Sequence, residues 1–326
     1  MRPDQVSVVI PAYNAEPTID ETLRSVRAQS HTALEVLIVD DGSQDGTRDI
    51  VRRHVREDCR LRLIEQSNLG VAMARNRGIA EANSDLVAPL DADDLWHPQK
   101  IEKQTALMRA CDSRVGLVYG WSASIDEHSR VIGYRHRPVA QGEVFSNLCK
   151  VNLVGNGSAA LMRKAALMEC GGYDASLKAR DAGGCEDLKV YLQIAERYEF
   201  RVVKEYLIGY RRSAGNMSSD WAQMFRSFEL VADEFVARRP ETGADFDDGR
   251  NFMLRFLLIR ALKDGEFGNS QAILRKMFAQ DWRYTTTALL RMPPTLISNL
   301  FASQLGGRFD DPDWLRRYSG EIVPAA

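Results

Sequence analysis

The chain has 326 residues, of which 44% are hydrophobic and 27% charged, with 43 basic side chains against 45 acidic ones. This composition is typical of a soluble globular protein of about two domains and excludes disorder, collagen-like repeats and coiled coil. The formal charge of −2 provides no general field for nucleic acid or anionic lipid and leaves only local basic patches open.

The cysteine pattern and the N-terminus indicate the compartment. Five cysteines stand at least 15 residues apart without a CxxC pair, which favours free thiols in a reducing compartment over a zinc site or a disulfide framework. The N-terminus shows no signal-peptide pattern, and the longest uncharged stretch, Met292 to Gly307, is too short to span a bilayer. We therefore expect a cytoplasmic protein, either free or peripheral at the inner face of the membrane.

Strands and helices alternate over the first 120 residues. Short apolar runs predict strands at Val6–Ile10, Leu34–Val39, Leu61–Glu65 and Leu86–Leu90. Helices are predicted from Thr18, over Gly46–Arg56 and over Val71–Ala82, and Thr18 with Glu21 matches the capping-box pattern. Continuous apolar strands separated by amphipathic helices predict an α/β fold with a mainly parallel sheet covered on both faces.

The rest of the chain is mixed and then helical. Strands are predicted at Val115–Trp121, Ser158–Met162 and Arg201–Tyr210, with a helix from Glu186 to about Tyr198. From Ser219 onward the pattern is almost wholly helical, with breaks at Asp281–Trp282 and Pro293–Pro294. The loop composition of Ser213–Asp220 marks the favoured domain boundary.

Polar or turn-forming residues follow each of the first four strands. The four sets are Pro11-Ala12-Tyr13-Asn14, Asp40-Asp41-Gly42-Ser43, Ser67-Asn68-Leu69-Gly70 with Arg75-Asn76 in the next helix, and Asp91-Ala92-Asp93-Asp94. In a parallel sheet these sets meet at the edge where ligands bind. An aromatic ring, carboxylates, an arginine and a glycine turn suit a nucleoside diphosphate held by a divalent cation.

Each set taken alone has a structural explanation. Tyr13 fits a surface aromatic, Asp-Asp-Gly-Ser a turn with a helix cap, and Arg75 a solvated helix residue. EF-hand spacing from Asp41 or Asp91 fails on ligand positions. A dinucleotide-dependent oxidoreductase is disfavoured, because no GxGxxG turn follows the first strand. The functional interpretation depends on the coincidence of four sets at four successive strand ends.

The ordered motifs resemble those of the family 2 glycosyltransferases, inverting enzymes of the GT-A fold. The segments that carry the resemblance are VSVVIPAYNAE, LIVDDGSQDGT, NLGVAMARNRG, DADD, GSAALMRKAALMECGGYDASL and Cys185-Glu186-Asp187-Leu188. It covers about Val6 to Asp220 and implies a GT-A domain over residues 1–215. That domain would have a nucleotide-sugar half over about 1–110 and an acceptor half over about 111–215, followed by a helical region over 216–326.

The resemblance also implies roles for individual residues. The donor-binding residues would be Pro11, Ala12, Tyr13, Asp41, Asn68, Gly70, Arg75 and Asp91. Among them, Pro11 and Tyr13 would line the base pocket and Asp41 would accept from uracil. Arg75 and the Asn68–Gly70 turn would approach the phosphates or the sugar, and Asp91 the ribose.

On the acceptor side, the resemblance implies Asp187 as the general base and Glu186 as a supporting or acceptor-side carboxylate. Asp93 would bind Mn²⁺ or Mg²⁺, with Asp94 as a candidate second ligand. A hydroxyl would attack the anomeric carbon while Asp187 takes its proton, which inverts the configuration. A helix N-terminus would favour the ionised form of Asp187, although helix capping explains two acidic residues there equally well.

Several signals are weaker. Ser213 stands where many relatives carry a histidine, so metal binding would depend on Asp93, diphosphate and water. Arg211 or Arg212 is either a phosphate ligand or part of a solvated surface pair. Further residues have mainly structural interpretations: Trp96 as core, His97 at a helix start, and Asn156-Gly157 as a turn or a sugar contact.

The expected partners are a nucleotide-sugar donor, UDP-linked by preference, and a glycan or lipid-linked acceptor in surface polysaccharide synthesis, without nucleic acid. Apolar residues alternate with arginines in the C-terminal helices, which favours packing or a homo-oligomer interface and leaves peripheral membrane contact open. The alternative function is a catalytically silent nucleotide-sugar-binding or scaffold protein.

Overall fold

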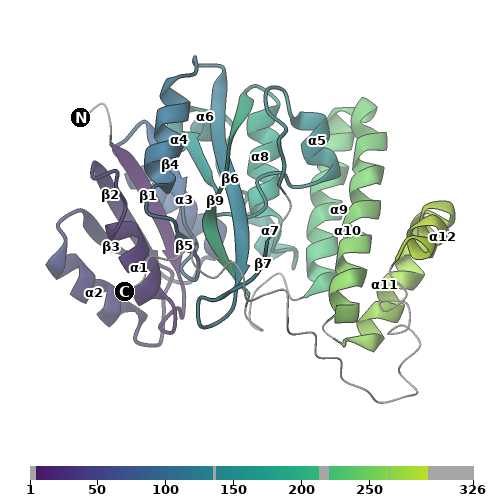
Figure 1. Cartoon of the computed structure of the whole chain (residues 1–326), viewed down its shortest axis with the longest axis horizontal. Coiled ribbons are helices and arrows are strands. Elements are labelled where there is room, and N and C mark those ends of the chain that lie inside the picture. Colours follow the sequence, from purple (N-terminus) through teal and green to yellow (C-terminus); the bar gives the residue numbers. More distant parts are fainter. Residues whose placement is uncertain (1–4, 135–136, 213–219, 264, 293–326) are drawn as a thin grey trace.

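The computed structural model describes residues 5–134, 137–212, 220–263 and 265–292 (Figure 1). Its strands are β1 (Val6–Ala12), β2 (Leu34–Asp40), β3 (Leu61–Glu65), β4 (Leu86–Pro89), β5 (Leu95–Trp96), β6 (Val115–Ile125), β7 (Val131–Tyr134), β8 (Ala160–Arg163) and β9 (Glu199–Arg211). Its helices are α1 (Ile19–Arg27), α2 (Thr47–Glu57), α3 (Val71–Glu81), α4 (Lys100–Arg109), α5 (Phe145–Lys150), α6 (Lys164–Glu169), α7 (Ser176–Ala179), α8 (Glu186–Ala195), α9 (Trp221–Arg238), α10 (Gly243–Lys263), α11 (Phe267–Gln280) and α12 (Trp282–Leu290).

The strands form one sheet in the order β3-β2-β1-β4-β8-β6-β9-β5, and β7 pairs with β6. β1 to β4 are mutually parallel, as predicted, with Val8 of β1 opposite Val36 on one side and Ala88 on the other. The second half is mixed, because β8 runs antiparallel to both β4 and β6 and β5 runs antiparallel to β9. The carboxyl ends of β1, β2 and β4 therefore lie together.

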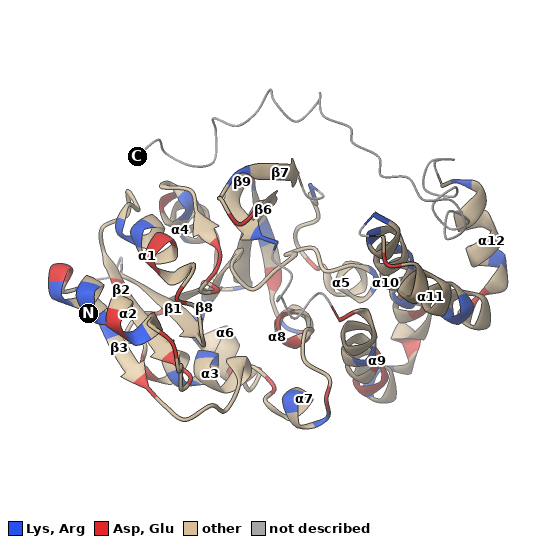
Figure 2. Ribbon diagram, turned by 90° about the horizontal axis from the view of Figure 1, so that it is seen from below, with Lys and Arg blue, Asp and Glu red and all other residues tan. Residues whose placement is uncertain are grey.

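β1 is central in the parallel half, and all seven of its residues are buried. Figure 2 shows α1 and α4 on one side of the sheet and α3 and α6 on the other. α3 approaches β1 closely because it carries Gly78, where a Cβ atom would lie 2.4 Å from Val9 Cγ1. This contact fixes α3, and with it Arg75, against the strand whose end carries Tyr13.

The predicted capping box at the start of α1 is wrong. Thr18 occupies the N-cap position without a side-chain cap hydrogen bond, and its Oγ1 donates instead to Ala92 O at 2.9 Å. The carboxylate of Glu21 accepts from Ser129 and, at 2.8 Å, from Arg211 Nη2. Both side chains therefore form hydrogen bonds with residues distant in sequence instead of capping the helix. The bond from Thr18 to Ala92 O connects the start of α1 to the Asp91–Asp94 loop.

The C-terminal helices pack against the end of the sheet domain. α9 and α10 stand beside α5 and α8, and α11 and α12 extend further from the sheet (Figure 1). Five buried residues of α9 and α10 belong to the same apolar core as the sheet: Phe228, Val231, Ala232, Phe235 and Phe246. A second core joins α10, α11 and α12, and Asp281 caps α12 through Tyr284 N at 2.9 Å, which confirms the predicted break.

A buried lysine also connects the two regions. Lys189 Nζ of α8 lies 2.6 Å from Asp174 Oδ2 and 2.5 Å from Glu234 Oε2 of α9. The boundary loop 213–219 and the break at Pro293–Pro294 lie outside the described residues, so the division at residue 215 stays a prediction. No helix in the described ranges is long and apolar enough to cross a membrane.

Candidate functional site

The four polar sets that follow the first strands come together at one edge of the sheet, as predicted. Asn14 N donates to Ser43 Oγ at 3.0 Å, which joins the ends of β1 and β2. Asp41 then contacts the Asn68–Gly70 turn, and Arg75 of α3 pairs with Asp91 after β4. The sheet therefore delivers all four sets to a single site.

The end of β1 offers one accessible aromatic side chain. Pro11 and Ala12 are buried within the strand, and Ala12 O accepts from Asp41 N at 2.8 Å. The Tyr13 side chain is 48% exposed, which leaves its ring free to stack on a planar ligand. The base-pocket role implied for these residues stays a prediction.

The Asp41 carboxylate shapes the turn that follows β3. Its Oδ1 accepts from Gln66 Nε2 at 2.7 Å and from Leu69 N at 2.8 Å, and its Oδ2 accepts from Gly70 N at 2.7 Å. Gly70 has a φ of +96°, a backbone conformation that would be strained for a residue with a side chain. Asp41 is thus buried and already hydrogen-bonded, so its implied contact with uracil would be additional to a structural role.

Arg75 is a buried residue and not a solvated one. Its Nη2 donates to Asp91 Oδ1, and its guanidinium carbon lies 5.1 Å from the centre of the Tyr173 ring. A Cβ on Gly157 would lie 2.7 Å from Arg75 Nη2 and 2.9 Å from Asp91 Oδ2, so a glycine is needed beside this ion pair. Arg75 Nε is buried without a partner in the described structure and remains available as a donor.

The loop after β4 divides its carboxylates between two environments. Asp94 is buried, and its oxygens accept from Ser158 Oγ at 2.6 Å and from Arg211 N at 2.9 Å. Asp94 therefore anchors the loop, which argues against the expectation that it shares metal binding. Burial and the neighbouring charge of Asp91 raise the pKa of Asp93 to about 6.

The oxygen donors of this loop fit a hard divalent cation such as Mg²⁺ or Mn²⁺. A cation would favour the ionised form of Asp93, which burial beside Asp91 opposes. In the described ranges Asp93 belongs to no group of three or more His, Cys, Asp or Glu side chains placed to hold a metal. The dependence on Asp93, donor diphosphate and water stays a prediction, and Ser213 lies outside the described residues.

Arg211 is not part of a solvated surface pair in this structure. It is buried, and it donates to Asp93 O at 2.8 Å, to Asp126 O at 2.9 Å and to Glu21 Oε2 at 2.8 Å. The solvated-pair interpretation is therefore wrong for Arg211, and the phosphate contact stays a prediction. The residue stabilises the Asp91–Asp94 loop through its hydrogen bonds to Asp93 O and to the Asp94 carboxylate.

Asp187 lies in the first turn of α8, close enough to the Arg75–Asp91 pair for both charges to act on its pKa. Its Oδ1 accepts from Leu188 N at 2.7 Å and its Oδ2 from Asn152 Nδ2 at 3.3 Å. Burial raises the pKa of Asp187 to about 6, although Arg75 and the Leu188 N–H oppose the shift. The direction is opposite to the one expected from a helix N-terminus alone, but the group is still mostly ionised at neutral pH.

Glu186 supports the start of the same helix. It is buried, and its Oε2 accepts from Gly184 N at 2.9 Å, which closes the turn before α8. Cys185 N, in that turn, donates to Ser227 Oγ of α9 at 3.1 Å. The supporting role implied for Glu186 is consistent with this geometry, whereas an acceptor contact stays a prediction.

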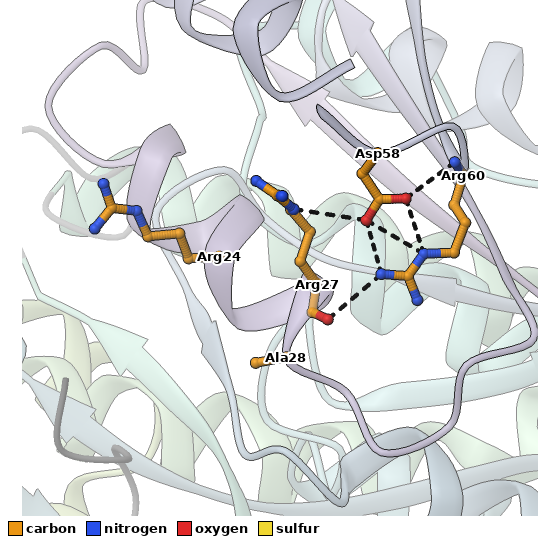
Figure 3. Close-up of a pocket in the computed structure, with 5 residues that line it drawn as sticks. All are labelled: Arg24, Arg27, Ala28, Asp58 and Arg60. Atoms are coloured by element: carbon orange, nitrogen blue, oxygen red, sulfur yellow. Dashed lines mark hydrogen bonds and ion pairs between the residues drawn. The ribbon is translucent and has the colours of Figure 1, made fainter. Parts of the chain in front are cut away.

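One hollow in the described part of the chain lies away from this site. It has a volume of about 370 Å³ and is lined by Arg24, Arg27, Ala28, Asp58 and Arg60 (Figure 3). Asp58 already pairs with Arg60 at 2.7 Å and with Arg27 at 3.5 Å. None of the predicted site residues lines it, so we do not assign the site to this hollow.

Comparison with known proteins decides the family. The family model described as glycosyl transferase family 2 matches residues 7–171, slightly more than half of the chain. The chain belongs to this family.

Curated family 2 relatives match over shorter segments. The putative teichuronic acid biosynthesis glycosyltransferase TuaG of Bacillus subtilis is 45% identical over 109 residues, which are 32% of this chain and 43% of TuaG. The uncharacterized glycosyltransferase alr2836 of Nostoc is 34% identical over 132 residues, 38% of this chain and 41% of that protein. The matched region therefore spans less than half the length of these relatives.

Solved structures confirm the predicted GT-A fold with its helical C-terminal region. Residues 1–349 of Staphylococcus aureus TarS, in complex with UDP-GlcNAc, superimpose with a TM-score of 0.62 at 18% identity, covering 98% of this chain and 99% of that one. The mannosyltransferase PcManGT of Pyrobaculum calidifontis, in complex with GDP-Man and Mn²⁺, gives 0.61 at 20% identity, covering 93% and 86%. These likenesses show the fold alone.

The family 2 motifs pointed to most of the site but not to its supporting residues. Asn76 brackets the Gly-Gly-Tyr-Asp turn, because its Oδ1 accepts from Tyr173 N at 2.8 Å and its Nδ2 donates to Tyr173 O at 2.7 Å. The signal that could have identified Asn76 was its position directly after Arg75 in the Arg-Asn motif. Asn156 Oδ1 accepts from Ser158 N at 3.0 Å, which closes a turn, and its Nδ2 donates to Ser122 Oγ at 2.7 Å, while a sugar contact stays a prediction. Trp96 belongs to the core, as expected.

Proposed function

We propose that the protein is a metal-dependent inverting glycosyltransferase that moves a sugar from a UDP-linked donor to a hydroxyl acceptor. The observation that carries the proposal is the meeting of Arg75, Asp91 and Asp187, which come from α3, the loop after β4 and the start of α8. The charges of Arg75 and Asp91 both act on the pKa of Asp187. A donor-side ion pair thus stands next to an ionisable carboxylate with a pKa near neutrality, as a general base requires.

The chain's own residues account for the chemistry of one displacement. Tyr13 stacks on the base, and Arg75 places positive charge where the nucleoside diphosphate departs. Asp187 takes the proton of the acceptor hydroxyl as its oxygen bonds to the anomeric carbon, and the bond to the diphosphate breaks with its electron pair on the leaving group. A divalent cation held by Asp93 would supply Lewis-acid stabilisation of that leaving group.

The donor and acceptor classes have separate support. The fold neighbours were solved with UDP-GlcNAc and with GDP-Man and Mn²⁺, and we prefer uridine because the motif resemblance implies a uracil contact for Asp41. The TuaG relative is named for teichuronic acid biosynthesis, which supports a glycan acceptor in polysaccharide synthesis. We propose a cytoplasmic location for the reaction, with a lipid-linked acceptor as one form of that glycan.

The first test is calorimetric titration of UDP, GDP and dTDP into the full chain, with and without Mn²⁺, for the wild type and Asp93→Ala. We expect Mn²⁺-dependent UDP binding that Asp93→Ala weakens at least tenfold. Absence of nucleotide binding by the folded wild type would contradict the proposal. Binding without transfer from any UDP-sugar would favour the silent binding or scaffold alternative.

A further inference from the structure

Lys178 reaches from α7 to the donor-side turn that follows β3. Its Nζ donates to Asn68 Oδ1 at 2.7 Å, across 110 residues of sequence. Its stem lies against the turn, since a Cβ on Gly70 would be 2.5 Å from Lys178 Cδ. The absence of a side chain at Gly70 therefore lets an exposed lysine of α7 lie on this turn.

The backbone N–H groups of Leu69 and Gly70 in this turn already have acceptors. Leu69 N and Gly70 N both donate to the buried Asp41 carboxylate, so they do not point at a ligand. Gly70 is also the N-cap of α3, and the start of that helix has no side-chain cap. Partial positive charge at this helix end and the Lys178 ammonium lie on the same turn.

Lys178 has no acidic partner in the part of the chain that the structure describes. The ion pairs near α7 join Asp174 to Lys189 and Arg180, and Asp181 to Arg226. The ammonium carries three N–H donors, and the contact with Asn68 uses one of them. Two donors and a full charge remain beside a site where the buried arginine of α3, Arg75, is already paired with Asp91.

We propose that Lys178 is a donor-binding residue whose ammonium contacts a phosphate oxygen of the nucleoside diphosphate. A compact, hydrated point charge suits phosphate oxygens better than it suits a planar base. The carboxylates of Asp91, Asp93 and Asp187 would otherwise oppose the entry of an anionic donor. This inference rests on the proposed function and adds a second cationic side chain, supplied by the acceptor half of the chain.

The test compares UDP, UMP and uridine by calorimetry with Mn²⁺ present. The variants are Lys178→Gln and Lys178→Arg, and the control is Lys204→Gln, which removes an exposed lysine of β9. We expect Lys178→Gln to weaken UDP binding about tenfold, with a smaller loss at high salt, and to leave uridine binding unchanged. Lys178→Arg should keep most of the UDP affinity, and Lys204→Gln all of it.

Each other outcome is informative. If wild type binds UDP and Lys178→Gln binds it equally well, this inference is overturned while the proposed function stands. An equal loss for UDP and uridine would place the lysine at the base and overturn the phosphate contact. If the folded wild type binds no nucleotide, the proposed function fails and this inference fails with it.

Discussion

Cys185 N donates a hydrogen bond to Ser227 Oγ at 3.1 Å, and this bond joins the start of α8 to α9. Met224 of α9 packs against Gly184, the residue before Cys185, because a Cβ on Gly184 would lie 2.3 Å from the Met224 sulfur. Asp187 stands two residues after Cys185. The C-terminal helices therefore help to position the proposed base and are not merely attached to the sheet domain.

Replacing Ser227 should separate positioning from stability. Ser227→Ala leaves the buried Cys185 N–H without an acceptor, which costs about 1–3 kcal/mol of unfolding free energy. We expect kcat to fall several-fold, with the UDP dissociation constant unchanged. The matched control is Ser270→Ala, because Ser270 is also buried but its Oγ donates locally, to the O atom of the α11 N-cap residue Glu266 at 3.0 Å. Equal kcat losses in the two variants would contradict the positioning role.

Asp187→Asn should abolish transfer without loosening the fold. Removal of a general base lowers kcat by about 10²–10⁴-fold. The folded pKa of Asp187 is raised above its ordinary value of 3.8, so its ionised form destabilises the fold fully above pH 6 and not at all below pH 3.8. The neutral amide removes that penalty, at most about 3 kcal/mol.

At pH 7.5 the melting temperature of Asp187→Asn should therefore equal or exceed that of the wild type. Glu186→Gln is the control, since an amide oxygen can still accept from Gly184 N, and it should lower kcat less than tenfold. Loss of activity accompanied by a lower melting temperature in Asp187→Asn would indicate a structural role instead.

The pH profile of transfer should report the same carboxylate. Because the base must be deprotonated, kcat measured at saturating donor and Mn²⁺ should decline below about pH 6 with a slope of one. The pKa of Asp93 is also raised to about 6, so kcat/KM should show a steeper acid limb than kcat. A kcat that stays constant down to pH 5 would exclude Asp187 as the rate-determining base.

Gly157→Ala should disturb the Arg75–Asp91 pair. The added Cβ would lie within 3 Å of both side chains, at 2.7 Å and 2.9 Å, so the buried ion pair must shift. We expect UDP affinity to fall about tenfold, with a modest loss of stability. Gly133→Ala is the control, because a Cβ there meets nothing within 4 Å. Wild-type UDP binding by Gly157→Ala would show that the pair is not needed for the donor.

The parallel half of the fold was predictable because its strands are continuous buried runs. The predicted strand Leu61–Glu65 coincides with β3, and the other three agree with the structure to within two residues. β5 could not be found, since Leu95 and Trp96 become a strand only by pairing with Gly209 and Ile208 of β9. A two-residue pairing made by tertiary contact has no periodicity to detect.

The site was predictable as a set of residues but not in its electrostatics. Motif order grouped Arg75, Asp91 and Asp187. The structure pairs Arg75 with Asp91 and lets both charges act on the pKa of Asp187, while the roles of the three residues stay predictions. The sequence could not show that the carboxylate oxygens of Asp41 and Asp94 accept hydrogen bonds from other residues of the chain. Those donors are brought to them by the packing of segments that are distant in sequence. For the same reason the raised pKa of Asp187, which follows from burial, reversed the expectation from its helix position.

The Lys189 ammonium limits how this architecture could be recombined. Because it is buried between Asp174 of the sheet domain and Glu234 of α9, a different helical partner would leave part of its charge uncompensated. Grafts of foreign C-terminal helices should succeed only when they bring a carboxylate to the place of Glu234. Any exchange of this helical region between related chains is thus constrained by a single charge on the sheet-domain side of the junction.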